Sequence, residues 1–329
     1  MKADVAIVIV AYNSADHIAT CLESVFEQRQ NVTQQVIVVD NASRDGTADL
    51  VRSRFPQVEL LLPGQNLGFA AGVNMGARHA DAEFVLLLNP DTEVLRHAID
   101  RIVEFARANP AFGFYGGRTL KPDGTLEPSS CWGQPTLWSM GLFAFGLTTL
   151  APRNRWLDPE SLGSWQRDSV REVGVITGCF LFAPKKVWDE LGGMDERYFM
   201  YGEDVDLSMR ARRAGYRPVI FPGAELIHEV GQCSDSPVHK TLLLYRGKAS
   251  LVRTQWTGLA RWLGLALLAT GTAVRAGLSG MGFAANRPGT AARWQTLWQK
   301  RHIWLPGYGA GSDGLAGLPA IPEPGTAPR

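Results

Sequence analysis

The sequence predicts an α/β fold built on a mostly parallel sheet with helices on both faces. Apolar runs of strand length alternate with segments whose apolar residues recur at helical spacing, the runs are rich in β-branched residues, and polar turns separate them. A composition of 45 % hydrophobic and 20 % charged residues is typical of a globular chain. The net charge of +1 gives no reason to expect nucleic-acid binding by the chain as a whole.

Strands and helices follow one another regularly in the first third of the chain. The first strand is an almost unbroken apolar run, as expected for a strand buried on both faces. The strands are predicted at 5–11, 36–39, 58–62 and 84–88, and the helices that follow them at 18–25, 47–54, 68–80 and 98–105. Farther along, a helix is predicted from Glu203 to Gly215 and a short strand at 225–227.

Short polar side chains follow each of the four strands. Ligands of a parallel sheet bind beyond the carboxyl ends of its strands, and carboxylates and amides placed there fit a nucleotide because they bond its base and ribose edges. Helix capping favours the same residue types and is the alternative interpretation of any single position. The residues concerned are Tyr12, Asn13, Asp40, Asn41, Asn66, Gly68, Asn89 and Asp91.

The turns after the strands exclude two nucleotide-binding classes. No GxGxxG motif follows the first strand and no P-loop motif occurs, so a dinucleotide-dependent dehydrogenase and a P-loop phosphotransferase lack their phosphate-binding loops. A nucleotidyltransferase would carry a glycine-rich, basic loop where this chain has Tyr-Asn-Ser-Ala-Asp at 12–16. Gly68, Gly72 and Gly76 recur every four residues, which predicts close packing of the third helix.

Two acidic segments predict a metal site and a catalytic base. Asp91 follows a buried strand, and a carboxylate there suits a divalent cation that takes its other ligands from water and a diphosphate. Glu203 and Asp204 begin a helix, where a carboxylate in a cleft serves as a general base for a hydroxyl nucleophile. His228 ends a short strand and is a candidate second metal ligand. The alternatives are capping for the acidic residues and a packed histidine for His228.

Aromatic residues precede the acidic helix. Tyr198, Phe199 and Tyr201 predict a concave wall of the kind that packs on the face of a sugar, and Tyr198 and Tyr201 are candidate contacts of the acceptor, as is Trp132. Within the helix, Asp206 is expected to pair with Arg210, which lies four residues later on the same face.

Five motifs follow one another between residues 5 and 207. They are Val-Ala-Ile-Val-Ile-Val-Ala-Tyr-Asn at 5–13, Val-Val-Asp-Asn-Ala-Ser-Arg-Asp-Gly-Thr at 38–47, Asn-Leu-Gly-Phe at 66–69, Leu-Asn-Pro-Asp at 88–91 and Gly-Glu-Asp-Val-Asp-Leu at 202–207. Through these motifs, in this order, residues 4–230 resemble the family 2 glycosyltransferases, which have the GT-A fold, and the resemblance implies a GT-A catalytic domain over 1–230. The Asn-Pro-Asp-Thr turn and the Asn-x-Gly-Phe loop are most similar to its rhamnosyltransferase-like branch.

The resemblance implies a role for each matching residue. Asp40 reads the pyrimidine ring, and Asp204 is the catalytic base with Glu203 beside it as acceptor contact or orienting partner. Asp91 holds a divalent cation, Mg²⁺ or Mn²⁺, and His228 completes the metal site. The other nucleotide contacts implied are Ala11, Tyr12, Asn13, Asn66, Gly68, Asn74 and Asn89. Many relatives carry Asp-x-Asp at the metal site, so Asn89 in place of the first carboxylate implies weaker or less strict metal binding.

The reaction that follows from this resemblance is a single inverting displacement. A sugar, L-rhamnose from dTDP-rhamnose, is expected to pass to a polysaccharide or a polyprenyl-linked glycolipid of the bacterial cell envelope. One alternative keeps the fold and uses a UDP-hexose or UDP-galactofuranose donor. Another is an inactive nucleotide-sugar binding module at the membrane, although a binding module needs no base such as Asp204.

The C-terminal third is basic and acid-free. Residues 241–305 contain nine Lys and Arg and no Asp or Glu, and tryptophans interleave with the cations. This pattern predicts a helical region over 231–305 that lies on an anionic membrane surface at the cytoplasmic face. A helical appendage packed on the catalytic domain is the alternative, and no nucleic-acid motif accompanies the basic residues.

Three further segments complete the predicted organisation. Residues 129–170 interrupt the α/β alternation and are expected to form an acceptor-side insertion that includes Trp132. Residues 306–329 are rich in Gly, Pro and Ala and predict a disordered tail. The apolar run at 5–11 is predicted to be a strand rather than a signal peptide. The four cysteines, which form no CxxC pair, are expected to be buried thiols in a reducing compartment.

Overall fold

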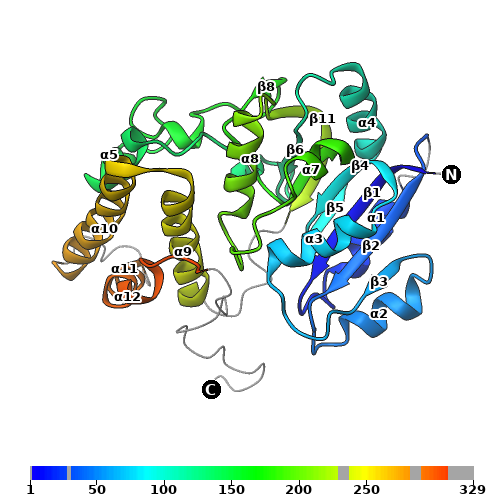
Figure 1. The fold of residues 1–329 in the computed structure, drawn as a ribbon, viewed down its shortest axis with the longest axis horizontal. Helices are drawn as coiled ribbons and strands as arrows, with labels where there is room; N and C mark the ends of the chain where they lie inside the picture. The colour runs from blue at the N-terminus through cyan, green and yellow to red at the C-terminus, as the bar shows by residue number, and fades with distance from the viewer. Residues whose placement is uncertain (1, 28–30, 229–236, 282–289, 310–329) are drawn as a thin grey trace. The chain divides into compact units, whose positions relative to one another are not determined.

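The strands predicted in the first third of the chain lie side by side in one nine-stranded sheet (Figure 1). β1 (Ala3–Ala11) runs parallel to β2 (Gln34–Asp40) on one side and to β4 (Ala82–Leu88) on the other, and β3 (Glu59–Leu61) extends the parallel part beyond β2. Val5–Ala11 is buried throughout, as predicted for a strand covered on both faces.

The other half of the sheet is mixed. β10 (Phe180–Pro184) runs antiparallel between β4 and β6 (Tyr115–Leu120). β11 (Val219–His228) lies parallel to β6 and pairs antiparallel with β5 (Thr92–Val94) and β8 (Arg171–Glu172). This return of the chain brings residues near 178 and 228 next to the end of β4.

Helices pack against the sheet through apolar faces at helical spacing. In α1 the buried residues are Ile18, Cys21, Leu22, Ser24 and Val25, close to the predicted set. The helices of this part of the chain are α1 (Ile18–Glu27), α2 (Thr47–Arg54), α3 (Phe69–His79), α4 (Ala98–Ala108), α7 (Lys185–Glu190) and α8 (Glu203–Arg213).

The structure is a computed structural model that describes residues 2–27, 31–228, 237–281 and 290–309, and it divides into two units. Unit 1 comprises Met1–Gln134, Trp165–Glu196 and Glu203–Cys233 and contains the sheet. Unit 2 comprises Pro135–Ser164, Arg197–Gly202 and Ser234–Arg329. The predicted boundary near 230 lies close to the last of these divisions, while most of the predicted insertion at 129–170 belongs to unit 2.

Unit 2 is helical. Its helices are α5 (Leu137–Ala144), α6 (Leu147–Leu150), α9 (Pro237–Gln255), α10 (Gly258–Gly280), α11 (Thr290–Gln299) and α12 (Arg301–Trp304). Trp304 is fully buried among these helices and donates its Nε1–H to Leu297 O at 2.8 Å. The remaining short elements are η1 (Pro128–Ser130), β7 (Cys131–Trp132), η2 (Pro159–Ser161) and β9 (Val175–Ile176).

The beginning of the predicted disordered tail is ordered. Tyr308 is buried, and its hydroxyl donates to Met200 O at 2.7 Å. Tyr308 explains why this part of the prediction was wrong. The prediction was based on the high Gly and Pro content of 306–329, which gives no sign that one large aromatic side chain in the segment packs against the protein. Residues 310–329, the rest of that predicted tail, lie outside the described residues.

The described cysteines agree with the prediction of buried thiols. Cys21, Cys131 and Cys179 are free and buried, while Cys233 lies outside the described residues. Burial raises the pKa of Cys21 to about 12, so its thiol stays protonated.

The small residues of α3 allow the helix to approach the sheet closely, as predicted. A Cβ built on Gly76 would lie 2.5 Å from Val8 Cγ1, and one on Gly72 would lie 2.9 Å from Val10 Cγ1. Both valines belong to the central strand β1, so the space is already filled.

We expect Gly76→Ala to lower the free energy of unfolding by about 1–3 kcal/mol, because the added methyl group overpacks the interface with β1. Urea unfolding followed by circular dichroism measures the change. Gly141→Ala is the matched control, since no atom lies within 4 Å of its built Cβ. Equal stability of Gly76→Ala and the wild type would contradict the close packing.

Candidate functional site

The ends of β1 and β2 form one polar edge of the sheet. Ala11 lies opposite Asp40 in the register. Asp40 is buried, and its Oδ1 accepts from the Ser43 N–H at 2.9 Å. Asn13 Oδ1 accepts from the Arg44 N–H at 2.9 Å, which ties the two turns together. The residues predicted to contact the nucleotide therefore share one edge, and turn formation accounts for part of their polarity.

Asn41 connects this edge to the loop before α3. Its Nδ2 donates to Gly68 O at 2.8 Å, and its Oδ1 accepts from the Leu67 N–H at 3.2 Å. Asn66 Oδ1 accepts from the Gly68 N–H at 2.9 Å. Gly68 has a φ of +82°, a conformation in which a side chain would be strained. The loop that carries Asn66 and Gly68 is thus fixed beside the end of β2.

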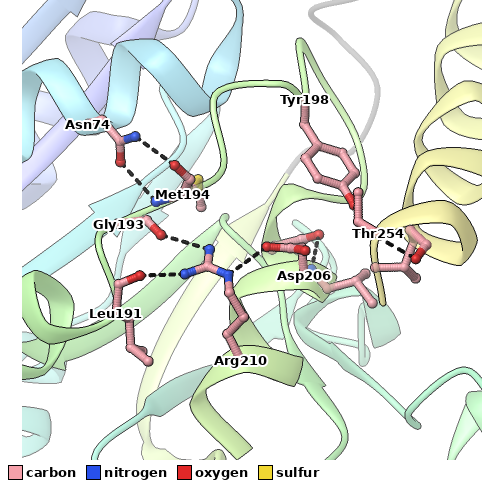
Figure 2. A network of polar contacts seen from close by, with 11 residues as sticks. Asn74, Leu191, Gly193, Met194, Tyr198, Asp206, Arg210 and Thr254 are labelled. Atoms are coloured by element: carbon pink, nitrogen blue, oxygen red, sulfur yellow. Dashed lines mark hydrogen bonds and ion pairs between the residues drawn. The ribbon is translucent and has the colours of Figure 1, made fainter. Parts of the chain in front are cut away.

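Asn74 lies deeper along α3 and bonds to the protein backbone (Figure 2). Its Nδ2 donates to Met194 O at 2.7 Å and to Glu196 Oε1 at 3.0 Å. Its Oδ1 accepts from the Met194 N–H at 2.9 Å. Because both ends of the amide are engaged by this loop, the position gives no support to the nucleotide contact that the resemblance implies for Asn74. Asn74 acts here as a link between α3 and the loop at 191–196.

The turn after β4 is held from two sides. The Asn89 N–H donates to Cys179 O at 3.3 Å, at the start of β10. Asn89 O accepts from the Thr92 hydroxyl at 2.7 Å and from Cys21 Sγ at 3.5 Å. These bonds fix the backbone on both sides of Asp91.

Asp91 and His228 meet because of strand register. His228 lies opposite Thr92 in the antiparallel pair of β11 and β5, so its imidazole reaches the residue before Thr92. His228 Nε2 is 3.4 Å from Asp91 Oδ1, and the two side chains are 8 % and 7 % exposed. Burial lowers the pKa of His228, but hydrogen bonds to Asp91 and Cys179 raise it more, to about 10.

The predicted catalytic base lies at the start of α8. Asp204 Oδ1 accepts from the Val205 N–H at 2.8 Å, and Oδ2 accepts from the Gly178 N–H at 3.4 Å. Burial raises the pKa of Asp204, and this effect outweighs the two N–H bonds, which lower it. A carboxyl group with a raised pKa is a stronger base once ionised, which suits proton removal from a hydroxyl. Glu203, beside it, is buried.

The segment from Gly178 to Cys179 brings these groups together. The Gly178 N–H donates to Asp204 Oδ2, Cys179 O accepts from the Asn89 N–H, and the Cys179 side chain is one of the groups that raise the pKa of His228. The pairing of Phe180 with Leu88 in the β10 and β4 register produces this junction. Sequence reasoning missed it, because no pattern near 178 signals that the strand after it returns to the end of β4.

Arg210 fixes the loop at 191–196 to α8 (Figure 2). Its Nε donates to Asp206 Oδ2 at 2.7 Å, which confirms the expected pair. Its two terminal nitrogens donate to Leu191 O at 2.6 Å and Gly193 O at 2.7 Å. The i, i+4 spacing predicted the ion pair, whereas the bonds to the loop gave no sequence signal. Since Asn74 holds the same loop from α3, the loop links the two helices.

The three predicted acceptor residues occupy different surroundings. Tyr198, in unit 2, is 1 % exposed, and its hydroxyl lies 2.9 Å from Thr254 Oγ1 (Figure 2). This buried ring offers no face to a sugar, so its position does not support the acceptor role. Tyr201 is half-buried, with a left-handed φ of +69°. Trp132, in unit 1, is 36 % exposed and keeps a free aromatic surface.

The donor set fits a cation that uses few protein ligands. Among the described residues, no group of three or more His, Cys, Asp and Glu side chains is arranged to hold a metal. Asp91 and His228 form a buried oxygen and nitrogen pair, and Mg²⁺ and Mn²⁺ take one or two protein ligands when water and a diphosphate supply the rest. An imidazole binds a metal only in its neutral form, so a cation at this pair competes with the proton on His228.

Comparison with family models and curated proteins gives consistent matches. Residues 6–157 match the model described as Glycosyl transferase family 2, and residues 160–286 match Glycosyl transferase family group 2. The chain is 34 % identical over 233 residues to the N-acetylglucosaminyl-diphospho-decaprenol L-rhamnosyltransferase of Mycobacterium tuberculosis, covering 68 % of this chain and 75 % of that protein. It is 26 % identical over 218 residues to the low-salt glycan biosynthesis hexosyltransferase Agl10 of Haloferax volcanii, covering 65 % and 63 % of the two chains.

A solved structure supports the same fold. The mannosyltransferase PcManGT from Pyrobaculum calidifontis, in complex with GDP-Man and Mn²⁺, superposes with a TM-score of 0.59 at 18 % identity. The match covers 92 % of this chain and 88 % of that one. At this identity the similarity establishes the fold.

Proposed function

The chain belongs to glycosyl transferase family 2 and has the GT-A fold, and from that premise we propose that it transfers L-rhamnose from dTDP-rhamnose to a polyprenyl-linked saccharide, with inversion at the anomeric carbon. The observation that carries the proposal is the Gly178–Cys179 junction, which bonds to Asp204 and to the Asn89 turn that precedes the Asp91–His228 pair. A base beside a cation-binding pair is what displacement of a nucleoside diphosphate requires.

Each of the residues named above has its own role in the displacement. Asp204 takes the proton from the acceptor hydroxyl as its oxygen attacks the anomeric carbon, and the bond to the nucleoside diphosphate breaks. Glu203 contacts or orients the acceptor. Asp91 and His228 would hold a divalent cation, which neutralises charge on the departing diphosphate when bound. The nucleotide contacts are Ala11, Tyr12, Asn13, Asp40, Asn66, Gly68 and Asn89.

The relative from Mycobacterium tuberculosis supports the transferred sugar and the acceptor class, because its name specifies L-rhamnose and an N-acetylglucosaminyl-diphospho-decaprenol acceptor. We place the reaction at the cytoplasmic face of the membrane, where such an acceptor meets nucleotide sugars, and in the synthesis of a cell-envelope polysaccharide. The acid-free helices of unit 2 agree with a peripheral position on an anionic surface.

Calorimetry of donor binding tests the donor assignment. The titrants are dTDP-rhamnose, UDP-glucose and UDP-galactose, each with and without Mn²⁺. Tightest, Mn²⁺-dependent binding of dTDP-rhamnose is the expected result. Tighter binding of a UDP-sugar would change the donor and keep the mechanism, and no binding of any titrant would indicate an inactive module.

We expect Asp91→Ala to weaken Mn²⁺-dependent donor binding by at least about tenfold, because the charged ligand of the pair is lost. The same calorimetric titration measures the change. Glu93→Ala is the matched control, since Glu93 is an exposed carboxylate two residues away on β5. Equal affinities of Asp91→Ala and the wild type would remove Asp91 from the metal site.

A further inference from the structure

The exposed face of α10 is mostly apolar and carries no charged residue along the helix. Its exposed residues recur every three or four positions, which places them on one stripe. They are Leu259, Trp262, Leu263, Ala266, Thr270, Val274 and Leu278, and Met281 follows the helix. Because a helix exposed to water normally carries charged residues on its outer face, this stripe, which we call the α10 stripe, requires another environment.

The opposite face of α10 packs within unit 2 and defines the stripe as an outer surface. Leu265 and Leu268 are buried there. A Cβ on Gly264 would lie 2.4 Å from the Trp256 ring, and one on Gly271 would lie 2.3 Å from the Phe143 ring. α10 therefore packs tightly against α5 and against the end of α9 (Figure 1).

The two arginines of α10 turn away from the stripe. Arg261 Nε donates to Trp256 O at 3.0 Å. Arg275 donates to Phe143 O at 2.7 Å, and its guanidinium lies 4.0 Å from the centre of the Phe143 ring. Both guanidinium groups are hydrogen-bonded to backbone carbonyls at the sides of the helix, and the two arginines lie about 21 Å apart along the helix axis. The apolar interval between them is too short to cross a hydrocarbon core of about 30 Å.

The neighbouring segment at 137–156 exposes further large apolar side chains. Trp138, Phe145, Leu150 and Trp156 are 64 %, 72 %, 80 % and 66 % exposed. Phe143 of α5 lies against Gly271 of α10, so this segment and α10 belong to one packed group. Unit 2 thus concentrates exposed apolar area on adjacent elements.

The positive charge of the same helices indicates which kind of partner covers the stripe. Residues 237–309 contain ten Lys and Arg and no Asp or Glu. Lys248, Arg293 and Arg301 are exposed among the described residues of this region. A protein partner with an apolar face would leave these cations unexplained, whereas anionic lipid accepts both apolar side chains and cations.

We propose that the α10 stripe is a membrane-insertion surface, on which α10 lies in the plane of an anionic bilayer without crossing it. By length and composition, Gly258–Ser279 is the one helix among the described residues that is able to span a membrane, and a third of its 18-residue window is buried within the protein. Two features favour the in-plane arrangement. One face of α10 packs against the protein through Gly264 and Gly271, and Arg261 and Arg275 are hydrogen-bonded at the sides of the helix. This inference rests on the proposed function only in that a lipid-linked acceptor is presented at that surface.

Flotation of the full-length protein with vesicles tests the surface. Vesicles of phosphatidylglycerol and phosphatidylcholine are compared with vesicles of phosphatidylcholine alone. We expect binding to the anionic vesicles, release by alkaline carbonate, and at least about tenfold weaker partition of Trp262→Ser/Leu263→Ser. Leu62→Ser is the matched control, because Leu62 is a 53 % exposed apolar residue of unit 1. It is expected to bind like the wild type.

Four outcomes would overturn the inference. They are equal partition of the double variant and the wild type, resistance to carbonate as shown by a spanning helix, equal binding to neutral vesicles, and a dimer in solution that the double variant dissociates without any vesicle binding. Transfer to a short-chain, water-soluble acceptor separates this inference from the proposed function. The double variant is expected to retain that activity, whereas absence of transfer in the wild type, with flotation intact, would refute the proposed function alone.

Discussion

Asp204→Asn is expected to reduce turnover by about 10²- to 10⁴-fold while leaving donor affinity unchanged. The amide keeps the size of the side chain, and its oxygen still accepts from the Val205 N–H, but its nitrogen can neither accept from the Gly178 N–H nor take a proton from the acceptor hydroxyl. Steady-state kinetics with calorimetric donor titration measures the two effects separately.

Protein stability provides the first control for this variant. Burial raises the pKa of Asp204, so ionising the carboxyl group opposes folding. The stability that the protonated carboxyl group contributes is therefore lost as the pH rises through the pKa of the folded protein. Asp204→Asn removes that cost and loses only the longer of the two bonds, the one from the Gly178 N–H at 3.4 Å, so we expect a melting temperature at neutral pH close to that of the wild type. Loss of turnover then reports lost chemistry rather than unfolding.

The pH profile and a neighbouring variant provide the second control. The acid limb of kcat/KM in the wild type is expected above the ordinary aspartate range, because Asp204 must be ionised to act as a base. Glu203→Gln is expected to lose less turnover than Asp204→Asn. Normal turnover in Asp204→Asn, or a larger loss of turnover in Glu203→Gln, would show that Asp204 is not the catalytic base.

Arg210→Ala is expected to lower the free energy of unfolding by about 3–5 kcal/mol and to reduce turnover more than donor affinity. Asp206 is 1 % exposed at its side chain and loses its cationic partner, and Leu191 O and Gly193 O lose their donors. The loop at 191–196 is then released from α8, which carries Asp204. Urea unfolding and steady-state kinetics measure the two effects.

Two variants sharpen the test of Arg210. Arg210→Lys keeps the charge but cannot make three divergent bonds, so an intermediate loss of stability is expected. Arg212→Ala, on the exposed side of the same helix, removes one bond to Val173 O and is expected to cost less than about 1.5 kcal/mol. If Arg210→Ala were no less stable than Arg212→Ala, the loop would not depend on the guanidinium.

Local patterns predicted the parallel half of the sheet and its polar edge well. The run at 5–11 and the stretch ending at Asp40 form adjacent buried strands in direct register. The third helix packs through Gly72 and Gly76 as expected. These features depend on apolar periodicity and residue size, both of which can be read from a short window of sequence.

Long-range pairing decided the features that the sequence did not reveal. The return of β10 to β4 brings Cys179 to Asn89, across a separation that no local pattern encodes. Tyr198 looked like part of a sugar-binding wall because of its aromatic neighbours, but Tyr308 packs against its ring from a segment expected to be disordered. In both cases the surroundings of the side chain depend on a residue far away in the sequence, and the residue type alone does not reveal them.

The discontinuity of unit 2 governs how this enzyme can be divided or recombined. A chain cut after Cys233 would remove the C-terminal helices but keep Pro135–Ser164 and Arg197–Gly202, which belong with them. The retained Phe143 would lose Gly271 and Arg275, and the Tyr198 ring would lose Thr254 and Tyr308. Chimeras that exchange this unit between family members must therefore carry all three segments as one cassette, and a simple tail swap is expected to give insoluble protein.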